Sequence, residues 1–165
     1  MNNYKKQGEN MNTPNNKINM LSTIPLKIKG RAIIEDYLKL KVNSILFMAE
    51  DDEWLFFVAC YPKNAKVKND KENLIDIRNN QVNSKDELDD VKEISSYIDL
   101  SHIFKIHVKN LKDFVKCATD ESYPFLNLQK QLEYVEKITS LTNGERSKAP
   151  KLVRINKKGD KLIEA

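Results

Sequence analysis

The stretch Ser44–Lys63, SILFMAEDDEWLFFVACYPK, decides the fold. Two apolar runs, Ile45–Ala49 and Trp54–Cys60, flank the acidic tetrad Glu50–Glu53. Their Ile, Phe, Trp and Val residues suit a pleated surface, and the short polar interruption predicts an antiparallel hairpin. The second run is nearly unbroken, so both of its faces are expected to be covered. Pro62 has no N–H for the ladder and is expected to end that strand.

The chain that leaves this hairpin is basic. Lys63, Lys66 and Lys68 follow Pro62 in an irregular segment. We expect the hairpin to carry this cationic loop to the surface, where it can meet a phosphate. The hairpin cannot be a membrane span, because its run of carboxylates would lie within the bilayer, and no membrane partner is expected.

Composition excludes several classes of protein. Of 165 residues, 40% are hydrophobic and 32% charged, and the net charge of +4 with a pI near 8.9 permits a polyanionic partner. The 4 glycines form no Walker loop or dinucleotide fingerprint, and the Cys and His residues form no zinc pattern. We therefore expect no metal and no cofactor. Cys60 and Cys117 end apolar runs and are expected to be buried thiols in a reducing compartment. No signal-peptide region is present, so we place the protein in the cytoplasm.

The two ends of the chain differ from its middle. Residues 1–22 are polar and rich in asparagine, which predicts a disordered tail before a single domain at residues 23–145. Residues 146–165 are basic again. There, Leu152–Ile155 and Lys161–Ile163 flank a polar turn, which predicts a terminal hairpin.

Hydrophobic spacing and turn residues predict the remaining elements of the domain. Pro25 confines the first strand to an edge, and Gly30 is expected to break it. The predicted elements are a strand at Ile24–Lys29, a helix at Arg31–Lys41, a strand at Asn73–Arg78, a helix from Ser84 to about Ser95, a strand pair or one bent strand over Ser96–Val108, and a short helix over Asn110–Cys117 capped by Asn110.

The strongest helix signal covers Asn127–Leu141. Asn143-Gly144 is expected to end it in a left-handed conformation. A stripe at helical spacing, formed by Leu128, Leu132, Val135 and Ile138, is expected to face the core. The polar residues expected to face water are Gln129, Lys130, Gln131, Glu133 and Lys137.

Together these elements predict an α+β protein with a strongly bent antiparallel sheet and added helices, and the resemblance described next implies an SH3-like barrel as the alternative. Their order, with the motifs FFVACYPKNAK and YPFLNLQKQLEYVEK, resembles the ToxN and AbiQ toxins of type III toxin–antitoxin systems across Leu26–Gly144. Those toxins are related to the MazF/PemK endoribonucleases, which are compact SH3-like β-barrels with helices added.

The resemblance implies a function and a set of partners. It implies a metal-independent endoribonuclease of a phage-defence or plasmid-maintenance module, held inactive by a repeated small RNA. The partners would be this antitoxin RNA and an mRNA substrate, and oligomers would form through RNA. In that family the loop after the strand reads Ser-Pro-Lys, and its Ser and Lys belong to the active site. Lys63 matches this loop, and Tyr61 stands in place of the serine.

These residues define the candidate site. Lys63 is expected to place a cation on the phosphorane, and Tyr61 to act as a hydroxyl acid or to stack on a base. His107 is a further candidate for the reaction. The basic residues expected to bind RNA are Lys66, Lys68, Arg31, Lys151 and Arg154.

A second hypothesis is a non-enzymatic protein of a mobile element, which binds nucleic acid or inhibits a protein partner. The basic residues 146–165, the acidic tip Glu50–Glu53 and the lack of a strong catalytic motif favour it. Nucleic-acid binding would weaken steeply as salt rises, whereas a salt-insensitive complex with a protein would favour the inhibitor.

Overall fold

The structure is a computed structural model that describes residues 20–66, 72–83, 95–116 and 123–164. Helices and strands both contribute to it, which confirms the α+β class. In chain order the elements are β1 (Thr23–Pro25), α2 (Ile28–Leu38), β2 (Ser44–Asp51), β3 (Trp54–Tyr61), β4 (Leu74–Asp76), β5 (Gln81–Val82), β6 (Tyr97–His107), α3 (Leu111–Phe114), β7 (Phe125–Leu126), α4 (Leu128–Asn143), β8 (Lys151–Ile155) and β9 (Leu162–Glu164), with short 3-10 turns at Val108–Asn110 and Arg146–Lys148.

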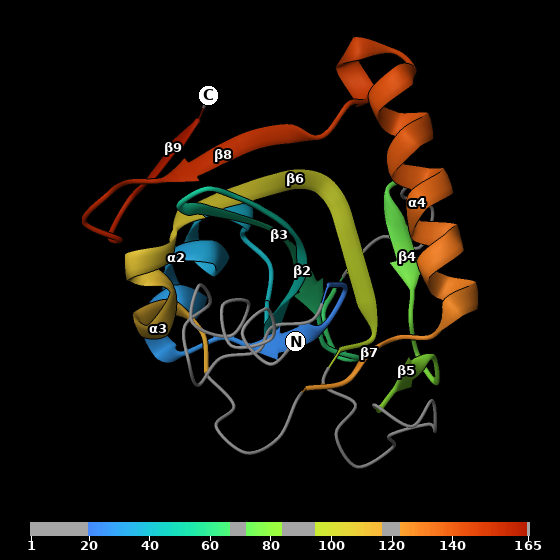
Figure 1. Cartoon of the computed structure of the whole chain (residues 1–165), viewed down its shortest axis with the longest axis horizontal. Helices are drawn as coiled ribbons and strands as arrows, with labels where there is room; N and C mark the ends of the chain where they lie inside the picture. Colours follow the sequence, from blue (N-terminus) through green and yellow to red (C-terminus); the bar gives the residue numbers. More distant parts are fainter. Residues whose placement is uncertain (1–19, 67–71, 84–94, 117–122, 165) are drawn as a thin grey trace, which may run out of the picture.

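Seven strands form one sheet in the order β1-β2-β3-β6-β8-β9, with β4 also paired to β6, while β5 and β7 pair separately. β6 is one strongly bent strand (Figure 1), and its register with β3 jumps from Phe57↔Phe104 to Ala59↔Asp99 at the bend. Along its other edge, β4 pairs before the bend and β8 after it. The β6–β8 pair is parallel, so the expectation of an entirely antiparallel sheet is wrong there. The long connection through α4 returns the chain in the same direction.

The hairpin predicted from Ser44–Lys63 is confirmed. β2 and β3 pair antiparallel from Ser44↔Cys60 to Asp51↔Trp54. β3 ends at Tyr61, directly before the proline. Its residues from Phe57 to Tyr61 are all buried, so both faces of this part of the strand are covered, as its apolar sequence predicts.

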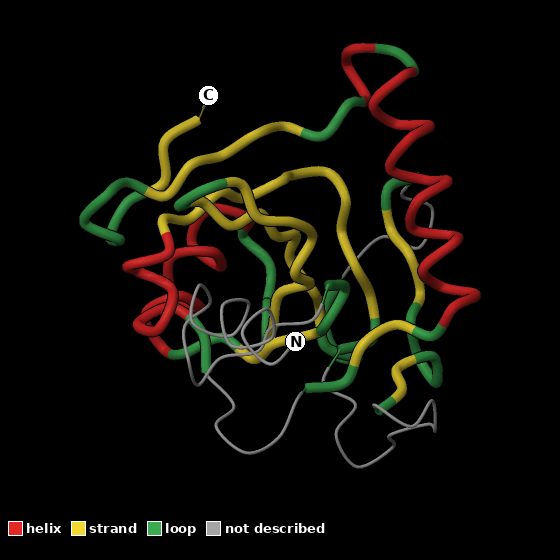
Figure 2. Tube along the Cα trace, in the orientation of Figure 1, coloured by secondary structure: helices red, strands yellow, loops and turns green. Residues whose placement is uncertain are grey.

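The sheet separates two apolar clusters. The inner cluster joins Phe57 of β3 to Ile34 of α2 and Phe114 of α3. The outer cluster joins Val58 of β3 to Tyr134 of α4. Accordingly, α2 and α3 lie on the opposite side of the curved sheet from α4 (Figures 1 and 2). Neighbouring residues of β3 thus serve different clusters, because successive side chains of a strand point to opposite faces.

Gly30 lies inside α2, so the prediction that it separates a strand from a helix is wrong. A Cβ at this position would sit 2.5 Å from the carbonyl oxygen of Phe114 and 2.8 Å from its ring. The glycine therefore allows α2 and α3 to approach closely rather than ending an element. The preceding strand is correspondingly shorter than predicted and ends at Pro25, at the edge of the sheet.

α4 begins where the sequence predicts, but it buries a different face. Leu128, Leu132 and Val135 are 69%, 56% and 51% exposed, so the predicted inward stripe is wrong for these residues. Tyr134 and Leu141 are buried against the outer cluster instead. Ile138, the fourth residue of the predicted stripe, is half-buried against this cluster, so the rotation of α4 about its axis leaves only Leu128, Leu132 and Val135 in solvent.

Two smaller predictions for α4 also fail. Gly144 has φ −91°, so the helix does not end in a left-handed residue. Lys130, Gln131 and Lys137 are half-buried rather than water-facing, and the Gln131 side-chain amide donates to the Leu126 carbonyl at 2.7 Å. Asn110 likewise does not cap α3 and instead donates its side-chain amide to the Lys157 carbonyl at 2.9 Å.

The predicted C-terminal hairpin is confirmed, and it belongs to the main sheet through the β6–β8 pairing. At the other end, Leu21 and Ser22 are buried, although the sequence places them in a tail. The predictions for residues 1–19, 84–94 and Cys117 lie outside the described residues. No helix in the described part of the chain is long and apolar enough to cross a membrane.

Candidate anion-binding pocket

One open pocket of about 520 Å³ lies where the end of β3, the chain after β4 and the start of α4 meet. It contains three cationic side chains, one carboxylate and several neutral polar groups. The lining residues are Lys63, Asp76, Arg78, Asn79, Asn80, Ser96 and Lys130. The cations come from segments that are far apart in the sequence, so the fold itself assembles this site.

Lys63 reaches the pocket from a tight turn. The Ala65 amide donates to the Pro62 carbonyl at 3.1 Å and closes the turn, which leaves Lys63 exposed at its corner. The strand before it is anchored, because the Ser96 amide donates to the Tyr61 carbonyl at 2.9 Å. Within the described residues, Lys63 makes no hydrogen bond or ion pair, so its ammonium is available to an anion.

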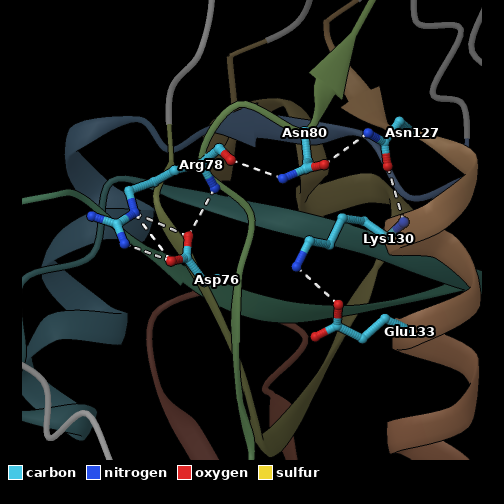
Figure 3. Close-up of polar contacts among 6 residues, drawn as sticks. All are labelled: Asp76, Arg78, Asn80, Asn127, Lys130 and Glu133. Atoms are coloured by element: carbon cyan, nitrogen blue, oxygen red, sulfur yellow. Dashed lines mark hydrogen bonds and ion pairs between the residues drawn. The ribbon is translucent and has the colours of Figure 1, made fainter.

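Arg78 and Asp76 line the same pocket as this lysine, and they form an ion pair (Figure 3). The guanidinium donates to the carboxylate through Nε at 3.0 Å and through Nη2 at 2.6 Å. It also lies over the Tyr97 ring, 5.4 Å from the centroid. Hydrogen bonds from Arg78, with a contribution from Lys130, lower the pKa of Asp76. This carboxyl is therefore ionised at neutral pH.

Asparagine side chains connect the loop that carries Arg78 to the start of α4. The Asn127 amide group donates to the Asn80 side-chain oxygen at 2.8 Å, and Asn80 donates to the Arg78 carbonyl at 2.8 Å (Figure 3). Asn127 also caps α4 by accepting from the Lys130 amide at 2.9 Å. The Lys130 ammonium then pairs with Glu133 at 2.8 Å. These bonds hold the arginine loop and the first turn of α4 in one arrangement.

The structure corrects the role expected of Tyr61. Its side chain is wholly buried, and its hydroxyl donates to the Asp99 carboxylate inside the sheet. Burial, followed by the nearby charge of Asp99, raises the pKa of this hydroxyl. A group that is buried and held protonated cannot reach a substrate at the pocket, so Tyr61 has a structural role here.

Of the other predicted RNA-binding residues, those that the structure describes do not line the pocket. Lys66 is exposed further along the same loop, and Lys68 lies outside the described residues. Arg31 lies on α2 and pairs with Glu35 at 3.3 Å. Lys151 and Arg154 lie on β8, which pairs with the part of β6 beyond its bend. His107 lies at the far end of the sheet from Lys63 and pairs with Glu53 at 3.4 Å.

Sequence reasoning finds one of the three cations of the pocket and misses the other two. Arg78 ends a predicted strand, which is the signal that could have placed it at a sheet edge. Lys130 is assigned to the water-facing side of its helix, yet its side chain is only 16% exposed. Only long-range contacts bring these two residues to Lys63.

The side chains of the pocket suit anion binding better than proton transfer. Its lysines and arginine can donate charge-assisted hydrogen bonds to phosphate oxygens. Its one carboxylate is occupied by Arg78 and has a lowered pKa, which makes it a weak general base. Among the described residues, no group of three or more His, Cys, Asp and Glu side chains could hold a metal ion.

Comparison with known proteins yields no relative. No protein-family model matches the chain, no curated protein matches its sequence, and no solved structure matches its fold. Functional inference therefore depends on the pocket and on the surfaces around it.

Proposed function

We propose that this protein binds RNA and holds a backbone phosphate in the pocket of Lys63, Arg78 and Lys130. The observation that supports this proposal is the meeting of three cationic side chains from distant segments in one open pocket. Lys63 is the primary contact, because it has no ion pair among the described residues. Arg78 and Lys130 already have carboxylate partners, and they add positive potential around the lysine.

The neutral groups of the pocket favour a nucleic acid over a simple anion. Asn79, Asn80 and Ser96 line the same space, and amides and hydroxyls can contact base edges or the ribose 2′-hydroxyl. The Arg78 guanidinium lies over the Tyr97 ring, 5.4 Å from its centroid, and arginine guanidinium groups are among those on which unpaired bases stack. A phosphate with an attached nucleoside uses both sets of groups.

A second candidate function is metal-independent cleavage of RNA by a toxin, as the likeness to the ToxN and AbiQ toxins implies. The observation that favours it is the exposure of Lys63 on the turn after β3, where that family places an active-site lysine. In this version Lys63 stabilises charge on the phosphorane. Tyr61 takes no part, so the proton acceptor would have to come from elsewhere, for example from the RNA or from water.

One experiment separates the two functions. Fluorescently labelled single-stranded RNA is incubated with the full chain, binding is followed by anisotropy at low salt, and the RNA is then examined on a denaturing gel. Intact RNA bound by the wild type and bound about tenfold more weakly by Lys63→Ala supports the binding function. Cleaved RNA that stays whole with Lys63→Ala supports the nuclease.

A matched control removes the same charge elsewhere. Lys112 lies exposed on α3 and does not line the pocket. Lys112→Ala should bind RNA as the wild type does. The proposal is wrong if the wild type binds no RNA at low salt, or if both alanine variants bind equally well.

A further inference from the structure

The part of the chain that the structure describes covers only part of the outer face of the sheet. α4 packs over the part that carries Val58 and Leu100, which belong to the outer cluster. Beyond the bend of β6 the strands continue with no helix of the described residues on this face (Figure 1). Leu152 and Ile163, on β8 and β9 there, are each 41% exposed.

A row of side chains crosses this uncovered half, one from each of five strands. Direct pairing joins them in the order Ala49, Phe56, Lys105, Arg154 and Ile163. Directly paired residues point to the same face of a sheet. Along β3, β6 and β8, the residues directly before and after each member of the row lie in the inner cluster. The row itself therefore faces outward. We call this row, together with Trp54, the outer platform.

One cation of the outer platform, Lys105, lies against two aromatic rings. The Lys105 ammonium is 4.8 Å from the centroid of the Trp54 ring and 5.7 Å from that of Phe56. Trp54 and Phe56 are two residues apart on β3, so both rings lie on this face about 7 Å apart along the strand. Half-buried aromatic side chains on a sheet surface are what unpaired bases stack on.

Lys105 and Arg154 are directly opposite each other in the β6–β8 register. Like charges at directly paired positions destabilise a sheet. Neither residue makes an ion pair with a carboxylate of the described chain. Of the nearby acidic groups, Asp51 is paired directly with Trp54, and Glu53 pairs with His107. A bound anion between the two cations would relieve their repulsion.

From these observations we infer that the outer platform binds single-stranded RNA. A phosphate lies between Lys105 and Arg154, and neighbouring bases stack on Phe56 and Trp54. This inference deepens the proposed RNA binding by adding a second contact surface. The pocket at Lys63 lies at the other end of β3, so the two surfaces would hold different parts of one strand.

Trp54 supplies a local probe, because it is the single tryptophan of the chain. The full chain is titrated with a 12-residue oligouridine while tryptophan fluorescence and RNA anisotropy are recorded. The inference predicts that fluorescence is quenched as RNA binds. It also predicts that the double variant Lys105→Gln/Arg154→Gln binds the RNA about tenfold more weakly, as measured by the quenching. Lys112→Ala should bind as the wild type does.

The outcomes distinguish this inference from the proposed function. If RNA binds by anisotropy but neither the fluorescence nor the double glutamine variant responds, the outer platform is wrong and the pocket stands. If Lys63→Ala abolishes binding while the platform variant binds normally, the platform is again excluded. Equal quenching by double-stranded RNA also contradicts it, because paired bases cannot stack on the rings. If no RNA binds at all, both proposals fall.

Discussion

The Tyr61 hydroxyl donates a hydrogen bond to the Asp99 carboxylate across the β3–β6 pair, where the two residues are 0% and 2% exposed. The second carboxylate oxygen accepts from the Ser101 amide at 2.9 Å. This contact fixes the last residue of β3 inside the sheet. Because the strand is held there, Lys63 emerges from the sheet two residues later, at the corner of an exposed turn.

Removing the Tyr61 hydroxyl should reduce the stability of the fold without changing the pocket. Tyr61→Phe leaves the buried Asp99 carboxylate with fewer donors, so the free energy of unfolding should fall by about 1–3 kcal/mol in urea denaturation. RNA binding at low temperature should be unchanged. Tyr97→Phe is the matched control, and it should change stability by less than about 0.5 kcal/mol. A Tyr61→Phe protein that stays fully stable but loses activity would instead make Tyr61 a catalytic residue.

The free energy of unfolding should fall at alkaline pH, and the Cys60 thiol should be the first group to contribute to this fall. Burial raises the pKa of this thiol from its ordinary value of 9.0 to about 12. Above pH 9 the unfolded chain therefore loses a proton that the folded chain keeps, so the stability present below pH 9 is lost as pH rises. The contribution is up to about 1.4 kcal/mol per pH unit.

The window from pH 9 to pH 10 isolates the thiol, because the raised tyrosine pKa values start from 10.0. Cys60→Ala should show a flatter dependence of unfolding free energy on pH in this window than the wild type. Cys117 is present in both proteins, so its contribution cancels. Identical slopes for the two proteins would show that the thiol is not protected as the structure indicates.

Gly30→Ala should destabilise the protein, although alanine is the better helix former by about 1 kcal/mol. The new Cβ would meet the Phe114 carbonyl oxygen at 2.5 Å, so α3 would have to move away from α2. We expect a net loss of about 1–3 kcal/mol in the free energy of unfolding. Lys29→Ala, at an exposed position in the same helix, should be nearly neutral. A stabilised Gly30→Ala protein would contradict the close packing of these two helices.

The orientation of α4 can be tested with two leucines. Leu141 is buried in the outer cluster, so Leu141→Ala should cost about 2–4 kcal/mol. Leu132 is 56% exposed, and Leu132→Gln should change stability by less than about 0.5 kcal/mol. Urea denaturation of both variants measures the difference. The reverse ranking would show that the helix packs through the face that its hydrophobic spacing predicts.

Local chemistry explains which parts of the fold could be predicted. The hairpin follows from two apolar runs around a polar turn, and its end at Tyr61 follows from Pro62, because both effects act within a few residues. The start of α4 is similarly local, since Asn127 accepts from the Lys130 amide. These signals need no knowledge of distant segments.

Long-range contacts explain what could not be predicted. Hydrophobic spacing points the Leu128 stripe inward, but the bond from Asn127 to Asn80 and the packing of Tyr134 in the outer cluster fix α4 in another rotation. The parallel pairing of β8 with β6 has no local signature. For the site, the exposed Lys63 turn could be predicted, whereas the meeting of Arg78 and Lys130 beside it could not.

The dependence of RNA affinity on salt tests the central claim most directly. Each phosphate contact to single-stranded RNA contributes about 0.7 to the slope of log affinity against log salt. Lys63→Ala should therefore bind more weakly than the wild type and show a slope shallower by about 0.7, while Lys112→Ala matches the wild type in both. Equal affinities and equal slopes for the wild type and Lys63→Ala would show that no phosphate is held at this pocket.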